Sequence, residues 1–169
     1  MSDKLFTYSA DLKNKIYRFA FSLLGNEEDA KDVAQEVFEK MWVKRFNFSI
    51  YQNKEALSLK LTRDLCFDKL KHRKMKSEKR NDLLNGKEDI YETMNELEER
   101  ELGEITHKLV ARLPEKQKMA IHLRDIEEME FEEIAEILDM EIDAIRMNLS
   151  RARKTIREQI IKIMNYGIS

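Results

Sequence analysis

The chain has 169 residues, which suits one ordinary domain or two small ones. Its 4 glycines and 1 proline, against 42% hydrophobic and 38% charged residues, disfavour a turn-rich sandwich or barrel and favour an all-α fold. The single cysteine, Cys66, excludes a disulfide within the chain and any multi-cysteine metal site. No apolar run approaches the roughly 18 residues of a membrane span, so we expect a cytoplasmic chain without membrane insertion of its own.

Charge is distributed unevenly, although the net charge is only −2. Residues 60–80 carry nine basic and three acidic side chains, and residues 146–162 carry six basic and one acidic. The segments 82–104 and 125–143 are acidic, with net charges of −7 and −10. Two basic segments separated by acidic ones indicate nucleic-acid binding that the total charge conceals.

The first half of the chain predicts three amphipathic helices. Apolar residues recur at helical spacing over residues 12–24, 30–41 and 57–70. Gly25 and Asn26 form a turn signal before the second helix, and Asn26 is placed to cap it. Three such helices close a small core, and residues 46–53, which lack a helical period, are interpreted as a loop.

Apolar residues thin out between residues 75 and 96, which we interpret as an interdomain linker. The helical period returns at Ile105, stops at Pro114 and resumes as far as Ile126. Residues 131–138 then predict a short helix and residues 145–163 a longer basic one. This spacing is that of a helix-turn-helix, whose second helix enters the major groove. The alternative is a helical hairpin with a solvated charged face.

The sequence offers little support for an enzyme. It contains no glycine-rich phosphate loop and no HExxH, and its histidines, His72, His107 and His122, are far apart. We therefore expect no catalytic residues, no cofactor and no bound metal.

Three runs carry a family resemblance: YRFAFSLLGNEEDAKDVAQEVFEKMW, TRDLCFDKLKHRK and LVARLPEKQKMAIHLRDIEEMEFEEIAEILDMEIDAIRMNLSRARKTIRE. In this order and spacing they resemble the extracytoplasmic-function group of bacterial RNA polymerase sigma factors. The patterns LPEKQ, FEEIAEIL and SRARK are individually loose, but their order together with DAKDVAQEVFEKMW makes the resemblance specific.

The resemblance implies a transcription initiation factor with two small helical domains. Residues 1–75 would bind core RNA polymerase and melt the downstream promoter element, and residues 101–169 would read the upstream element through the helix-turn-helix. Residues 76–100 would form an acidic linker. Core RNA polymerase and promoter DNA are the implied partners, and whether an anti-sigma factor sequesters the chain stays open. The alternative is a stand-alone helix-turn-helix regulator that dimerises through DAKDVAQEVFEKMW.

The resemblance also implies residues for the first domain. Those expected to bind polymerase lie on the second helix: Asp32, Gln35, Glu36, Phe38 and Trp42. Core packing is the alternative for Phe38 and Trp42. Those expected to bind the downstream element follow in the loop and the basic helix: Phe48, Tyr51, Gln52, Asn53, Lys60, Arg63, Asp64, Lys69 and Lys71. Aromatic and amide groups suit an unstacked base, while lysine and arginine hold the backbone.

The residues expected to bind the upstream element lie in the second domain: Arg124, Arg146, Met147, Asn148, Ser150, Arg151, Arg153 and Lys154. Arg124 matches a phosphate-binding position, and residues 146, 147, 150 and 151 share one helix face. Departures from the family pattern stand at Glu130, Asp139, Asp143 and Met147. The first three weaken anion binding at helix starts, and a methionine favours a thymine methyl over a polar base edge.

Overall fold

The computed structural model describes residues 2–43, 53–80 and 99–166. These residues form α1 (Ser2–Leu24), α2 (Glu27–Val43), α4 (Lys54–Arg80), α5 (Glu99–Ala111), α6 (Glu115–Ile121), the π-helical turn η2 (His122–Ile126), α7 (Phe131–Leu138) and α8 (Ile142–Tyr166). The described residues contain no strand, and the all-α prediction is confirmed. The predicted loop residues Phe48, Tyr51 and Gln52 and residues 81–98 of the predicted linker lie outside the described part.

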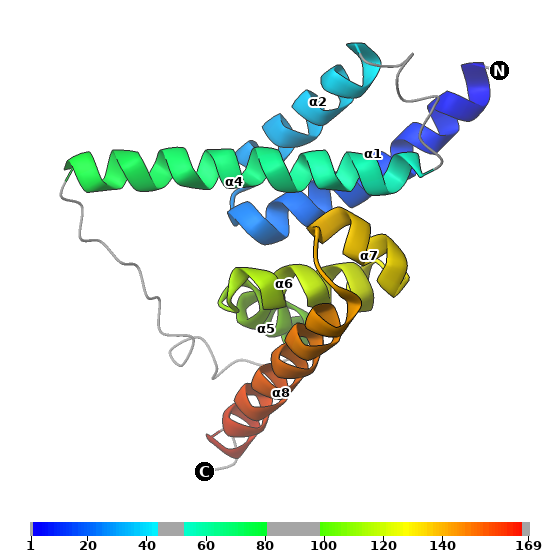
Figure 1. Cartoon of the computed structure of the whole chain (residues 1–169). Helices are drawn as coiled ribbons and strands as arrows, with labels where there is room; N and C mark the ends of the chain where they lie inside the picture. Colours follow the sequence, from blue (N-terminus) through cyan, green and yellow to red (C-terminus); the bar gives the residue numbers. More distant parts are fainter. Residues whose placement is uncertain (1, 44–52, 81–98, 167–169) are drawn as a thin grey trace.

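Helices α1, α2 and α4 form the N-terminal unit, in which the long α4 crosses α1 (Figure 1). Gly25 has φ +65°, a value that glycine adopts without strain, and it turns the chain between α1 and α2. The Asn26 side chain accepts a hydrogen bond of 3.0 Å from the backbone N–H of Asp29, as the predicted cap requires. The apolar stripe of α2 faces inward and packs with Phe19, which is fully buried.

Small and polar residues line the buried face of α4. Ser58, Thr62 and Cys66 are all fully buried. The hydroxyl groups of Ser58 and Thr62 donate to the backbone oxygens of Glu55 and Ser58, at 2.7 and 2.8 Å, so they are satisfied within the helix. Burial raises the pKa of the Cys66 thiol to about 12. This face therefore packs closely without an unpaired hydroxyl group.

Helices α5 to α8 and η2 form the C-terminal unit. The predicted break at Pro114 is confirmed, because α5 ends at Ala111 and α6 begins at Glu115. The turn η2 was not predicted: the backbone N–H of Glu127 donates to His122 O at 3.0 Å, five residues back. Asp139 ends α7 in the left-handed region, with φ +52°. Helices α7 and α8 with this tight turn have the predicted helix-turn-helix order.

The two units pack directly against each other. Helix α7 lies against α4, and α1 lies against α5, α6 and η2 (Figure 1). The far end of α8 extends away from the N-terminal unit (Figure 1). The helix-turn-helix is therefore held by the helix that carries the first basic segment.

Candidate polymerase and nucleic-acid interfaces

The residues predicted to bind polymerase lie on α2 and differ in exposure. Asp32 and Gln35 are exposed, and Glu36 lies 3.6 Å from Lys40 on the same helix. Trp42 is 70% exposed, so core packing, the alternative at this position, is not observed. Phe38 is partly buried and packs on the core. Helix α2 thus presents a polar strip that ends in an exposed indole.

A groove of about 800 Å³ lies beside this strip, between α1 and α2. Gln35 and Phe38 line it from α2, and Tyr17 lines it from α1. The ring of Tyr17 stacks on that of Phe21, with centroids 6.1 Å apart. The strip and the groove together form one surface with polar and aromatic parts, which is the composition of a protein-binding site.

The basic residues predicted for the downstream element are spread along α4. Lys71 is exposed, whereas Lys60, Arg63 and Lys69 are half-buried. The Lys69 ammonium lies 3.9 Å from Asp29 on α2. Asp64 is exposed and accepts hydrogen bonds of 3.0 and 2.7 Å from the neighbouring Arg63 guanidinium. Apart from Lys71, these cations already have anionic partners within the chain.

Two of these cations bind the C-terminal unit. Arg63 donates to the backbone oxygen of Ile137 at 2.7 Å and to Asp139 Oδ2 at 3.2 Å. The Lys60 ammonium donates to Asp139 Oδ1 at 2.9 Å. Asn53, another predicted DNA residue, donates to Glu133 at 3.2 Å. The helix-turn-helix therefore occupies donors of three residues that were predicted to bind DNA. The hydrogen bonds from Lys60 and Arg63 lower the pKa of Asp139.

A second interdomain contact involves residues that the sequence did not single out for any site. Arg18 on α1 donates twice to Glu127 just after η2, at 2.8 and 2.9 Å. The Glu127 side chain is only 2% exposed, and the buried His122 Nε2 lies 3.3 Å from its Oε1. Burial alone would raise the pKa of Glu127, but the hydrogen bond from Arg18 and the neighbouring His122 lower it to about 2. The carboxylate is therefore charged when the two units are packed.

The exposed face of α8 carries several predicted upstream-element residues. Met147 is 51% exposed, and Ser150 and Arg151 are also exposed. The Lys154 side chain is 71% exposed. Other members of the set have partners within the chain, and Asn148 and Arg153 are two of them. Asn148 donates to Ala144 O at 2.8 Å, and Arg153 binds Asp125 through two hydrogen bonds of 3.0 and 2.6 Å. Met147, Ser150 and Arg151 face solvent, whereas the Lys154 ammonium lies 4.0 Å from Glu158 on the same helix.

The positions that depart from the family pattern have local structural roles. At the start of α7, the Glu130 backbone N–H donates to Glu133 Oε2 at 3.1 Å, which satisfies one helix-end donor. Asp143 accepts a contact of 3.4 Å from Arg146. Asp139 takes the left-handed conformation for which glycine is the usual residue. Acidic groups therefore occupy the starts of α7 and α8.

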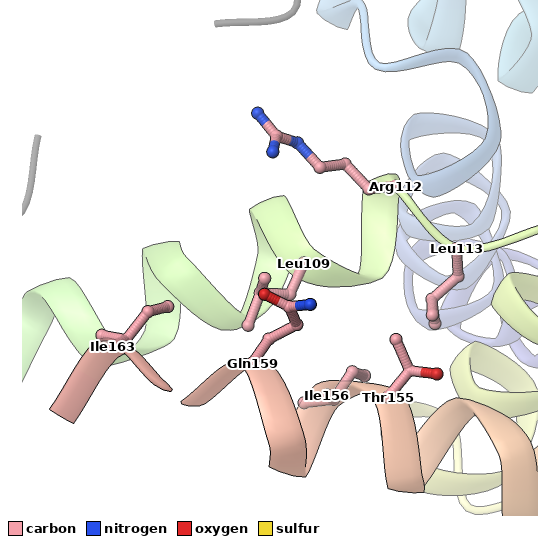
Figure 2. Close-up of a pocket in the computed structure, with 7 residues that line it drawn as sticks. All are labelled: Leu109, Arg112, Leu113, Thr155, Ile156, Gln159 and Ile163. Carbon is pink, nitrogen blue, oxygen red and sulfur yellow. The ribbon is translucent and has the colours of Figure 1, made fainter. Parts of the chain in front are cut away.

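A cavity of about 300 Å³ lies between α5 and α8, near the C-terminal end of α8 (Figure 2). Leu109, Leu113, Ile156 and Ile163 supply its apolar wall, and it contains none of the residues predicted for polymerase or DNA.

Within the described ranges, no group of three or more His, Cys, Asp or Glu side chains could hold a metal ion. Among those same residues, no helix is long and apolar enough to cross a membrane.

Two family models match the chain in the order that the helices suggest. The model for sigma-70 region 2 matches residues 10–75, and the model for sigma-70 region 4 matches residues 103–156. The RNA polymerase sigma factor SigV of Bacillus subtilis is 30% identical over 165 residues, 94% of this chain and 92% of its own length. The extracytoplasmic-function sigma factor SigW of the same organism is 27% identical over 159 residues, 88% of this chain and 84% of its own length.

Solved structures have the same fold. The sigma factor RpoE in complex with the anti-sigma factor NepR, from Bartonella quintana, superposes with a TM-score of 0.75 at 20% identity, over 93% of this chain and 96% of that one. CnrH in complex with the cytosolic domain of CnrY gives 0.68 at 16% identity, over 96% and 90%.

The chain belongs to the bacterial RNA polymerase sigma factors, in the extracytoplasmic-function group. It is a transcription initiation factor that binds core RNA polymerase and directs it to promoters. The stand-alone regulator, the alternative considered from the sequence, is not favoured.

Proposed function

We propose that the two helical units divide the work of initiation. Residues 1–75 bind the polymerase and open the downstream element, and residues 101–169 read the upstream element. Residues 76–100 connect the two parts. In this assignment the chain catalyses no reaction of its own, and it acts in the cytoplasm, where bacterial polymerase transcribes the chromosome.

The polymerase site in this proposal is the polar strip of α2 with the groove next to it. Asp32, Gln35 and Glu36 supply charge and hydrogen bonds, and Trp42 supplies an exposed aromatic anchor. Buried aromatic contacts and charge complementarity are what give an interface its affinity and its specificity. The exposure of Trp42 and the groove beside Gln35 and Phe38 support this assignment.

The DNA sites are the basic face of α4, with Asn53, and the exposed face of α8. In the free chain the α4 site is closed by the C-terminal unit. Arg63 carries the proposal, because its guanidinium binds Ile137 O and Asp139 where it would otherwise bind DNA. Free chain should therefore bind promoter DNA poorly, and polymerase binding must separate the two units before the downstream strand can enter.

Reconstitution tests the proposal. Purified chain is mixed with core RNA polymerase, run on a size-exclusion column, and assayed for initiation on genomic DNA fragments. We expect one complex that starts transcription at a limited set of sites, whereas neither component does so alone. Elution as a dimer that binds DNA but never joins the polymerase would favour the stand-alone regulator instead.

An anti-sigma factor is the regulatory partner that we propose. The two solved relatives are complexes, one with the anti-sigma factor NepR and one with the cytosolic domain of CnrY. Purifying the chain from its own cells before and after stress, with mass spectrometry of whatever co-purifies, tests this. We expect a stoichiometric non-polymerase partner before stress that is replaced by polymerase subunits afterwards.

A further inference from the structure

Phe131, the first residue of α7, brings two arginines together. The guanidinium carbon of Arg124 lies 4.6 Å from the centre of the Phe131 ring, and that of Arg146 lies 5.0 Å from the same point. Arg124 belongs to η2 and Arg146 to the first turns of α8, so three elements meet at one ring. The negative face of an aromatic ring attracts cations, and arginine is the cation most often found there.

The ring itself has a fixed place. Phe131 is partly buried and packs against the core of the C-terminal unit. An arginine that rests on a fixed ring has fewer conformations to lose on binding, and this lowers the entropic cost of ordering it. The contact therefore prepares both guanidinium groups before a ligand arrives.

The remaining contacts leave N–H donors available on both arginines. Arg124 donates to Met129 O at 2.7 Å and lies 3.5 Å from Glu130. Arg146 lies 3.4 Å from Asp143, whose side chain is 95% exposed. The Arg146 side chain is itself 59% exposed, and that of Arg124 is 30% exposed. Each guanidinium has five N–H donors, so both can take an anionic ligand without leaving the ring.

We propose that Phe131 is a positioning residue for upstream promoter DNA, whose ring holds Arg124 and Arg146 ready to bind one stretch of the duplex. The inference rests on the proposed assignment of α8 to the upstream element. Arg124 then binds the DNA backbone, and Arg146 approaches it from the neighbouring helix. Phe131 does not need to touch DNA, because its contribution passes through the two arginines.

The test uses full-length chain in complex with core polymerase. The probe is a duplex upstream element selected from a randomised DNA pool by the wild-type complex. Phe131→Leu keeps an apolar side chain but removes the ring. Phe131→Met replaces it if the leucine variant is destabilised, and Phe131→Tyr keeps the ring as the control. Thermal unfolding and complex formation are measured first for every variant.

We expect Phe131→Leu to weaken DNA binding roughly three- to tenfold and Phe131→Tyr to bind within about twofold of the wild type. In a chain that already carries Arg124→Ala and Arg146→Ala, Phe131→Leu should have no further effect. The inference is overturned if Phe131→Leu binds DNA with wild-type affinity. It is also overturned if Phe131→Leu weakens DNA binding just as much in the chain that lacks Arg124 and Arg146. Either result leaves the proposed function intact, whereas a wild-type chain that fails to direct polymerase contradicts that function itself.

Discussion

Arg18 and Glu127 are 109 residues apart in the sequence and form a two-bond ion pair that joins the N-terminal and C-terminal units. The Glu127 carboxylate is buried, while Arg18 reaches it from the surface of α1. A second joint lies where Lys60 and Arg63 meet Asp139. Each joint holds together two parts that the proposed function requires to separate.

The first prediction concerns the buried joint. Glu127→Gln should destabilise the packed chain by roughly 2 kcal/mol at pH 7, since it removes a charged hydrogen-bond acceptor from Arg18. The pKa of Glu127 is lowered to about 2 from an ordinary value of 4.5. Its contribution is therefore complete above about pH 4.5 and is lost as the pH falls toward 2. The unfolding temperatures of the wild type and of Glu127→Gln should converge as the pH falls over that interval. A difference that persists at pH 2 would contradict a stabilising role of the Glu127 carboxylate.

The second prediction concerns the exposed joint. Asp139→Gly keeps the left-handed turn, where φ is +52°, and removes the carboxylate that binds Lys60 and Arg63. Free chain should then bind a mixed-sequence single-stranded oligonucleotide about two- to fivefold more tightly. The matched control is Asp68→Asn, which removes an exposed carboxylate from α4, the helix of Lys60 and Arg63, and should have no such effect. Equal affinities for both variants would show that Asp139 does not mask α4.

The third prediction concerns the polymerase site. Asp32→Lys combined with Glu36→Lys should weaken binding to core polymerase by about tenfold or more, because reversed charges disturb association while the buried stripe of α2 is untouched. Surface plasmon resonance with immobilised polymerase measures the loss, and circular dichroism checks the helix content. Glu104→Lys, an exposed reversal on α5, is the control. Unchanged affinity with native circular dichroism would remove α2 from the interface.

The fourth prediction separates base contacts from phosphate contacts on α8. Arg151→Ala should cost roughly 1–3 kcal/mol on the selected promoter and little on unrelated DNA. Lys154→Ala should weaken binding evenly on both and reduce the salt slope by about one. Competition binding at several salt concentrations makes the distinction. Arg146→Ala should also lower initiation from the selected promoter. Wild-type initiation by all three variants would show that α8 does not bind the upstream element.

The fifth prediction concerns Cys66. Its thiol is fully buried, with a pKa of about 12, so the reactive thiolate is scarce at pH 8. A maleimide or disulfide reagent should label native chain at least about a hundredfold more slowly than chain unfolded in urea. Mass spectrometry of timed samples gives both rates. Fast labelling of folded protein would mean that α4 opens away from its neighbours far more often than the packing indicates.

Local signals predicted the described helices well. Asn26 before three acidic residues marked the start of α2, and Pro114 marked the break between α5 and α6, because both act through the few residues beside them. The extension of α4 to Arg80 was less visible, since its last turns are almost wholly polar and carry no apolar stripe.

Contacts between distant residues were beyond the sequence. Nothing near Arg18 indicates Glu127 as its partner, and nothing near Arg63 indicates Ile137 O, because such pairs depend on how complete units pack. The sequence shows that segments 60–80 and 125–143 have opposite charge, but only the structure shows that Lys60 and Arg63 meet Asp139. The ring of Phe131 was expected only as part of an apolar stripe, so its two arginines were missed.

The unusual turn η2 has a consequence for the alignment of the two units. In an α-helix, residues five positions apart point about 140° away from each other, whereas the bond from Glu127 N–H back to His122 O stacks these two residues on one side. One residue more or less in this turn would rotate Glu127 away from Arg18. Insertions and deletions in η2 should therefore change the rotation of the C-terminal unit relative to α1. Chimeras with related chains should keep residues 122–127 together with Arg18.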